Sequence, residues 1–146
     1  MKRLMWAMPA ALLGSLMLVT PAQAYGEPWD WCSSVTVNSN GAKNVAALSV
    51  SGNCDGGRLR LTGSLQRRSG GFDLRGAMGS TAVILKGQVG TYTAIYGSID
   101  YEDVDIKGSG SKYFCDLDGW IAGEYVSPQD GSLFGRLCPI LVGLRR

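Results

Sequence analysis

The sequence predicts an all-β protein, and three observations support that fold class. Apolar and polar residues alternate with a period of two, as in strands with one buried face. Glycine-rich turn signals separate the alternating segments, and an aliphatic-x-Gly triplet recurs at steps of ten to thirteen residues. This spacing predicts a small antiparallel up-and-down barrel or a strongly curved sandwich of about eight to ten short strands. A β-solenoid is the alternative, because stacked rungs also give a fixed period.

Residues 1–24 are expected to form a cleavable secretory signal. Lys2 and Arg3 precede an apolar stretch that ends at Val19, and small residues surround the expected cleavage site after Ala24. The uninterrupted apolar run within this stretch is shorter than the roughly 20 residues that span a bilayer. No later segment is apolar enough to be a transmembrane helix. We therefore expect a single β domain over residues 25–146, located in the periplasm or secreted.

The charge balance gives no reason to expect a nucleic-acid partner. The chain has 14 Lys and Arg against 12 Asp and Glu, and removing Lys2 and Arg3 with the signal leaves 12 against 12. A nucleic-acid-binding surface needs a basic excess. The charges are nevertheless segregated, with five arginines between residues 58 and 75 and four acidic residues between 100 and 105. They form either solvated faces that keep strand edges soluble or a bipolar surface that steers a charged partner.

The alternating segments follow one another along the middle of the chain. Their expected inward-facing residues are Leu59, Leu61, Leu65, Phe72, Leu74, Met78, Val83, Leu85 and Val89. A two-residue turn at Gly90-Thr91 would match the twist of a hairpin. That turn predicts a register with Leu85 opposite Tyr96 and Gly87 opposite Ala94.

Several of the recurring glycines lie inside the predicted strands rather than at turns. The triplets are Val50-Ser51-Gly52, Leu61-Thr62-Gly63, Leu74-Arg75-Gly76, Leu85-Lys86-Gly87, Ile95-Tyr96-Gly97, Ile106-Lys107-Gly108, Leu117-Asp118-Gly119, Leu133-Phe134-Gly135 and Leu141-Val142-Gly143. An interior glycine weakens a strand unless it permits a bend or a close backbone approach. Tightly coiled small barrels use such bends. An outer-membrane barrel ranks third, because its strands need about 9–11 residues with an apolar lipid face.

Cys32, Cys54, Cys115 and Cys138 all follow the signal, and their even number predicts two disulfide bonds in an oxidising compartment. Zinc is disfavoured, because the chain has no close-spaced cysteine pair and no His. Sequential pairing is one connectivity, but a two-residue turn at Asn40-Gly41 would place Cys32 opposite Ser49. Pairing Cys32 with Cys138 would instead join the first strand to the last. The sequence leaves the connectivity open.

The residue types argue against catalysis. Without His, the commonest general base is missing, together with the nucleophile–His and His–metal families. Asp103 and Asp105 are expected side by side on one strand face, which suits the opposed carboxyls of a glycosidase poorly. Calcium takes several oxygen ligands, but the acidic segment lacks a recognisable calcium-loop pattern. We therefore expect no cofactor, no bound metal and no enzyme activity.

Three pairs of residues are candidates for ligand contact: Trp29 and Trp31, Arg58 and Arg60, and Asp103 and Asp105. In an extended segment both indoles would point the same way and form a stacking surface for a sugar or a side chain. Alternatively, one or both indoles attach the amino-terminal segment to the domain beside Cys32.

These features predict an exported, disulfide-stapled binding module. It would act by protein–protein contact, as a periplasmic inhibitor or immunity-type protein does, on another envelope or secreted protein or on a glycan. A structural or adhesin-like protein that assembles through β-edges is the alternative. A carbohydrate-binding protein or a carboxylate-based hydrolase ranks third.

Overall fold

The computed structural model describes residues 27–41 and 43–145 of the 146-residue chain. The predicted secretory signal and its cleavage site lie outside the described residues. The described residues include no helix with the length and apolar character that a bilayer crossing requires.

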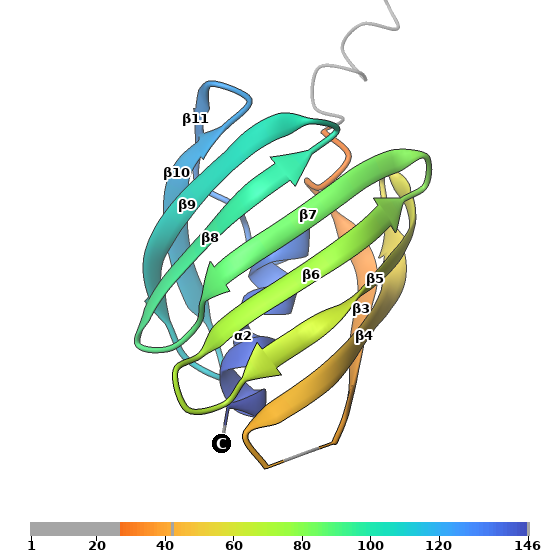
Figure 1. Cartoon of the computed structure of the whole chain (residues 1–146). Coiled ribbons are helices and arrows are strands. Elements are labelled where there is room, and N and C mark those ends of the chain that lie inside the picture. The colour runs from red at the N-terminus through yellow and green to blue at the C-terminus, as the bar shows by residue number, and fades with distance from the viewer. Residues whose placement is uncertain (1–26, 42, 146) are drawn as a thin grey trace, which may run out of the picture.

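A nine-stranded antiparallel sheet dominates the structure and confirms the all-β fold class. Each strand pairs with its neighbour in the sequence, so the sheet is a simple meander (Figure 1). This topology excludes the stacked rungs of a solenoid. The strands are β3 (Cys32–Asn40), β4 (Val45–Cys54), β5 (Gly57–Gln66), β6 (Gly71–Met78), β7 (Thr81–Gln88), β8 (Tyr92–Ile99), β9 (Glu102–Gly110), β10 (Cys115–Ile121) and β11 (Glu124–Val126).

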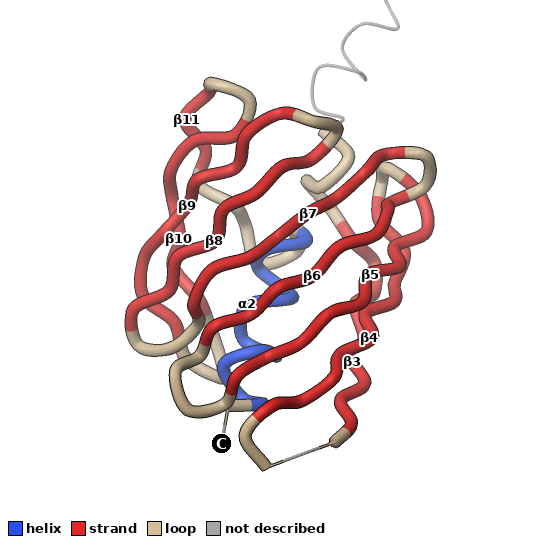
Figure 2. Tube along the Cα trace, viewed as in Figure 1, coloured by secondary structure: helices blue, strands red, loops and turns tan. Residues whose placement is uncertain are grey.

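The sheet curls strongly but does not close into a barrel. Its two ends, β3 and β11, are not paired with each other. A carboxy-terminal helix, α2 (Leu133–Leu144), lies inside the curve behind the sheet (Figures 1 and 2). The predicted strongly curved architecture is therefore confirmed, whereas barrel closure is not. The helix covers inward apolar surface that side chains of the opposite wall would cover in a small closed barrel.

The prediction of a strand pattern through the carboxy terminus was wrong, because residues 133–144 form α2. The triplets that end at Gly135 and Gly143 lie in this helix and do not belong to the strand repeat. The buried residues recur with helical spacing: Leu133, Phe134, Leu137, Cys138 and Leu141. The helix begins after Ser132, whose hydroxyl accepts a hydrogen bond from the Gly135 amide at 3.0 Å.

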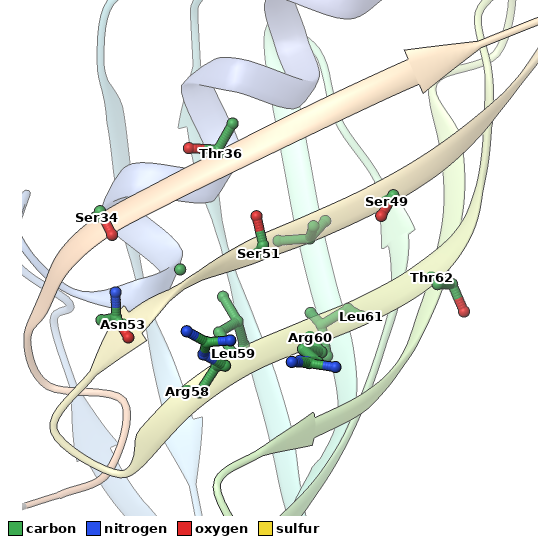
Figure 3. Close-up of a pocket in the computed structure, with 12 residues that line it drawn as sticks. Ser34, Thr36, Ser49, Ser51, Asn53, Arg58, Leu59, Arg60, Leu61 and Thr62 are labelled. Atoms are coloured by element: carbon green, nitrogen blue, oxygen red, sulfur yellow. The ribbon is translucent and has the colours of Figure 1, made fainter.

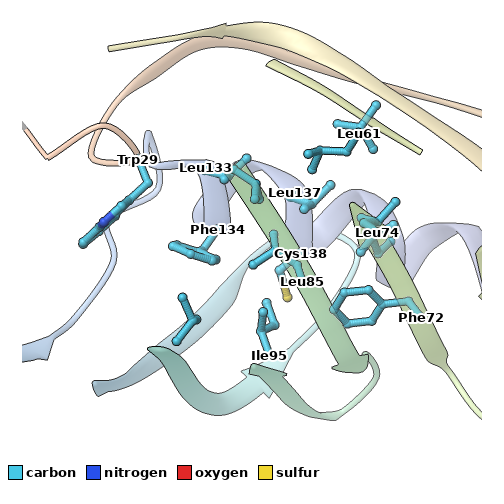
Figure 4. Packing of buried hydrophobic residues seen from close by; sticks show 14 of the residues in the cluster. Trp29, Leu61, Phe72, Leu74, Leu85, Ile95, Leu133, Phe134, Leu137 and Cys138 are labelled. Atoms are coloured by element: carbon cyan, nitrogen blue, oxygen red, sulfur yellow. The ribbon is translucent and has the colours of Figure 1, made fainter. Parts of the chain in front are cut away.

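The core lies between the concave face of the sheet and α2. Figure 4 shows Leu61, Leu74, Leu85 and Ile95, from four successive strands, gathered around the helix. All four side chains are 1% exposed or less. Burying a large aliphatic side chain stabilises a fold by roughly 1.5–3 kcal/mol. The alternation that predicts strands therefore also identifies the residues that hold the sheet onto the helix.

The strand-interior glycines allow neighbouring backbones to approach closely, as predicted. A Cβ atom at Gly63 would lie 1.7 Å from the carbonyl oxygen of Asp73, and one at Gly76 would lie 2.0 Å from that of Arg60. Real side chains cannot occupy such positions without shifting the adjacent strand. Each glycine lies two residues after a buried aliphatic residue, although both glycines are themselves exposed. The missing Cβ atoms let adjacent strands approach closely, which allows the sheet to bend at these positions.

All four cysteines are paired, and the pairing is sequential. Cys32 bonds to Cys54 between β3 and β4, and Cys115 bonds to Cys138 between β10 and α2. The two-residue turn expected at Asn40-Gly41 is not formed, because the β3–β4 ladder ends at the pair Asn40 and Ala47. The longer loop shifts the register, and a β-bulge between Cys32 and Ser34 then brings Cys32 opposite Cys54. The alternative bond from Cys32 to Cys138 is therefore excluded.

Hydrogen bonds fix both ends of α2. At its start, the Leu133 amide donates to the carbonyl of Trp29 at 2.9 Å. At its end, the guanidinium of Arg145 donates to the carbonyls of Arg67, Arg68 and Val89 at 3.1, 2.6 and 2.9 Å. Arg145 thereby ties the helix to the β5–β6 and β7–β8 turns.

Candidate functional site

The outer face of the curved sheet presents alternate residues to solvent, and the strand register arranges them in rows. One row runs across β7 to β11 through Lys86, Tyr96, Asp105, Trp120 and Tyr125, each directly opposite the next. All five side chains are exposed. Acidic side chains lie beside this row. We use the name acidic-aromatic face for seven outward residues of β8 to β11: Tyr96, Asp103, Asp105, Asp116, Asp118, Trp120 and Tyr125.

Three large aromatic side chains lie exposed in this row. Tyr96, Trp120 and Tyr125 are 47%, 54% and 58% exposed. Trp120 and Tyr125 contact each other edge to face, with ring centroids 5.5 Å apart. A cluster of exposed apolar rings is uncommon on a monomer surface unless it meets a partner. Tyrosine and tryptophan are also the residues that most often dominate binding energy at protein interfaces.

A hydrogen bond fixes the ring of Tyr125. Its hydroxyl donates to Oδ2 of Asp118 at 2.6 Å. This hydrogen bond is the main reason that the pKa of Tyr125 is raised above its ordinary value, with smaller contributions from burial and the Asp118 charge. Because Tyr125 is held by Asp118 and touches Trp120, the two rings are partly ordered before any partner arrives. Such preorganisation lowers the entropic cost of binding.

The acidic-aromatic face carries a strong negative charge. Residues 92–126 contain seven acidic and two basic side chains. One ion pair joins two described residues, Lys107 Nζ and Asp105 Oδ1 at 3.8 Å, and both side chains are more than half exposed. Within the described residues no group of three or more His, Cys, Asp or Glu side chains is arranged to hold a metal ion. The unpaired carboxylates therefore favour a positively charged partner surface.

A shallow groove of about 610 Å³ runs between the outward side chains of β7, β8 and β9. Lys86, Tyr96, Asp103 and Asp105 line it. The predicted pair Asp103 and Asp105 thus lies side by side on β9, and the structure adds the Tyr96 ring between Asp105 and Lys86. The groove can accept a basic side chain, because carboxylates and an aromatic ring meet there.

The two amino-terminal tryptophans do not form a shared stacking surface. A turn, closed by the Asp30 amide and the Glu27 carbonyl at 3.0 Å, replaces the expected extended segment. Trp29 is 5% exposed and packs edge to face on Phe134 of α2, so its ring belongs to the core. Trp31 is 51% exposed and lies 5.2 Å from the Arg136 guanidinium. The structure therefore separates the two indoles, and only Trp31 is open to a partner.

Arg58 and Arg60 lie far along the sheet from the acidic-aromatic face. They project from β5 beside a groove of about 520 Å³ that extends to β3 and β4 (Figure 3). Serine, threonine and asparagine side chains also line this groove, together with Val50, Gly52, Leu59 and Leu61. Of the six candidate contact residues, Trp29 lies in the core, and the other five fall in three separate places rather than in one site.

No protein-family model matches the chain, and neither the curated proteins nor the solved structures include a significant match. The site itself must therefore support any functional conclusion.

Sequence reasoning missed the aromatic part of the acidic-aromatic face. The predicted β7–β8 register was one residue off: Leu85 lies opposite Gly97, and Gly87 lies opposite Ile95. A slip of one residue moves every side chain to the other face. The predicted register placed Tyr96 on the inner face with Leu85, whereas the observed register places it outward. The sequence signal was the alternation around Tyr96 itself, because Thr93, Ile95 and Ile99, which share one parity, are buried.

Proposed function

We propose that this chain is an exported binding module that contacts a positively charged site on another envelope or secreted protein. The predicted secretory signal supports export. The two disulfide bonds support it as well, because such bonds form and persist in oxidising compartments. An inhibitor or immunity-type protein acts in this way, by occupying a site on its partner.

The observation that carries this proposal is the acidic-aromatic face. Aromatic rings supply contact area at low entropic cost, and the surrounding carboxylates supply complementarity to a basic surface. The whole chain contains no His, so binding is better supported than acid–base catalysis. Edge-to-edge assembly has less support, because β11 has only three residues and β3 lies beside α2.

Capture of a partner from envelope extracts at low salt, followed by titration of the purified pair, tests this proposal. We expect Trp120→Ala to weaken binding at least about 30-fold, as loss of a central interface residue does. We expect Asp105→Asn to lower mainly the association rate and its dependence on salt.

Tyr113→Ala is the matched control, because Tyr113 is an aromatic residue that is 82% exposed and lies outside the row. This variant should change affinity by less than about threefold, as for a contact outside an interface. The proposal fails if the wild-type protein captures no partner at low salt. It also fails if Tyr113→Ala weakens binding as much as Trp120→Ala does.

A further inference from the structure

The groove on the outer face of β3, β4 and β5 is built differently from the acidic-aromatic face. Two cross-strand rows of polar side chains line it, and the strand register sets each residue directly opposite the next. The rows are Ser34–Asn53–Arg58 and Thr36–Ser51–Arg60, and we call them together the arginine groove (Figure 3).

Each row of the arginine groove ends in a guanidinium that has no partner within the described part of the chain. Neither the Arg58 nor the Arg60 guanidinium takes part in a hydrogen bond or an ion pair there. A guanidinium offers five donors in a planar fork that matches a carboxylate or a phosphate. Two such groups beside an open groove therefore provide two anion-binding positions.

The spacing of the two rows indicates the kind of ligand. Arg58 and Arg60 are two positions apart on one strand, so their Cα atoms are separated by roughly 7 Å. Ser34 and Asn53 in one row, and Thr36 and Ser51 in the other, supply hydroxyl and amide groups beside the two charges. A ligand that fits this pattern carries repeated anionic groups on a scaffold rich in hydroxyls.

We propose that the arginine groove binds an acidic oligosaccharide. Its carboxylates would pair with Arg58 and Arg60, and its hydroxyls would bond to the short polar side chains of β3 and β4. Among the described residues no aromatic side chain lines the groove, so recognition rests on charge and hydrogen bonds rather than on ring stacking. The surroundings favour an anion, because residues 32–78 contain six basic and two acidic side chains.

This site is independent of the acidic-aromatic face, because the two share no residue and lie over different strands. An acidic glycan held by β3 to β5 would leave β8 to β11 free for a protein partner. The protein would then join an anionic polymer to a basic protein.

Calorimetric titration of the full chain with three probes tests the proposal. The probes are an oligogalacturonate, which has one carboxylate per sugar, a neutral glucan of the same length, and inorganic phosphate. We expect the oligogalacturonate to bind, the neutral glucan not to bind, and phosphate to bind more weakly. Arg58→Gln and Arg60→Gln should each weaken oligogalacturonate binding about 10- to 100-fold, as loss of a charge-assisted hydrogen bond does.

Arg68→Gln is the matched control, because Arg68 is an exposed arginine in the β5–β6 turn outside the groove and its loss removes the same charge. This variant should bind oligogalacturonate like the wild type. The Ser51→Ala variant should weaken binding about 3- to 10-fold, which tests the hydroxyl contacts. The proposal is overturned if oligogalacturonate does not bind, if the neutral glucan binds equally well, or if phosphate binds as tightly. It is also overturned if Arg68→Gln has the same effect as Arg58→Gln.

Discussion

The two halves of the sheet have the same construction on their inner faces and opposite chemistry on their outer faces. In both halves a buried aliphatic residue is followed two positions later by a glycine, as at Leu61 and Gly63 in β5 and at Ile106 and Gly108 in β9. Outward, residues 32–78 are mainly basic and hydroxylated, whereas residues 92–126 are mainly acidic and aromatic. The inner faces of the two halves therefore carry the same residue types, whereas their outer faces carry different ones.

This contrast distinguishes the inward residues, which stabilise the fold, from the outward residues, which form the surface available to partners. Successive side chains of a strand point to opposite faces, so the inner pattern and the outer pattern occupy different positions. The inner pattern is constrained by the helix and by the close approach of neighbouring strands. The outer pattern is free of these constraints, so one sheet can carry two surfaces of opposite charge.

The halves also differ in how a disulfide bond holds them. Cys32 and Cys54 lie opposite each other in the β3–β4 ladder, where strand pairing already holds them together. Cys115 and Cys138 join β10 to α2, which no strand ladder connects. The Cys32–Cys54 bond reinforces two strands that are already paired, whereas the Cys115–Cys138 bond holds α2 against β10.

The largest expected effect is loss of the bond to the helix. The chain-entropy model gives each bond about 3 kcal/mol, because the closed loops are nearly equal, with sequence separations of 22 and 23 residues. Cys115→Ala/Cys138→Ala should therefore lower the free energy of unfolding by about 3 kcal/mol and also speed amide exchange in α2. Chemical denaturation and hydrogen exchange by mass spectrometry measure the two effects.

Cys32→Ala/Cys54→Ala is the matched variant for the other half. It should lower the free energy of unfolding by a similar amount, about 3 kcal/mol, while α2 stays protected. If both variants expose α2 equally, the proposed difference between the two bonds is wrong.

The next effect tests whether the inner faces of the two halves are equivalent. A Cβ atom at Gly63 would lie 1.7 Å from the Asp73 carbonyl oxygen, and one at Gly108 would lie 1.9 Å from that of Asp116. Gly63→Ala and Gly108→Ala should therefore destabilise the protein to similar extents, by about 1–3 kcal/mol each. Thermal and denaturant unfolding provide the comparison.

Gly143→Ala is the control for the loss of a glycine. Gly143 lies in α2, and a Cβ atom there would meet only the Lys112 side chain at 3.5 Å, an ordinary contact. This variant should stabilise the helix by about 0.4–1 kcal/mol, the opposite sign from the strand variants. A neutral effect at either Gly63 or Gly108 would contradict the close approach of the strands in that half.

The inner face was predictable from the sequence because it obeys local rules. Period-two alternation identified Leu61, Leu74 and Leu85 as core residues, and all three are buried. The aliphatic-x-Gly spacing identified the bends of the sheet, since glycine inside a strand has few other physical uses. The even cysteine count predicted two bonds, and the structure forms both.

The helix and the registers were not predictable by the same rules. Gly135, Pro139 and Gly143 are poor helix formers, so local propensity hides α2. Packing of the apolar side of α2 inside the curved sheet outweighs that propensity. The hairpin registers depend on loop geometry: the β3–β4 loop is longer than Asn40-Gly41 suggested, and this change determines the cysteine pairing.

The candidate sites were predictable only in part, because they depend on register. The segregation of charge identified Arg58 and Arg60, and Asp103 and Asp105, each as a pair on one strand face. The row that joins Asp105 to Trp120 requires the pairing of β9 with β10, which sequence spacing alone did not establish. A turn, rather than the expected extended segment, separates Trp29 from Trp31.

The smallest expected effect tests the order of the acidic-aromatic face, a feature with no counterpart in the arginine groove. The Tyr125 hydroxyl donates to Asp118, and this hydrogen bond raises the pKa of Tyr125 above its ordinary value of 10.0. Asp118→Ala should therefore lower the pKa of Tyr125 toward that value, as measured by NMR of the tyrosine ring carbons during alkaline titration. Asp116→Ala removes the same charge from the same strand without removing the hydrogen bond, so the pKa of Tyr125 should stay raised. In the wild type, the contribution of this bond to stability is fully present below the unfolded-state pKa and is lost as the pH rises through the higher folded-state pKa. An equal fall in the pKa of Tyr125 in both variants would mean that the general negative charge of the face, rather than the hydrogen bond to Asp118, raises this pKa.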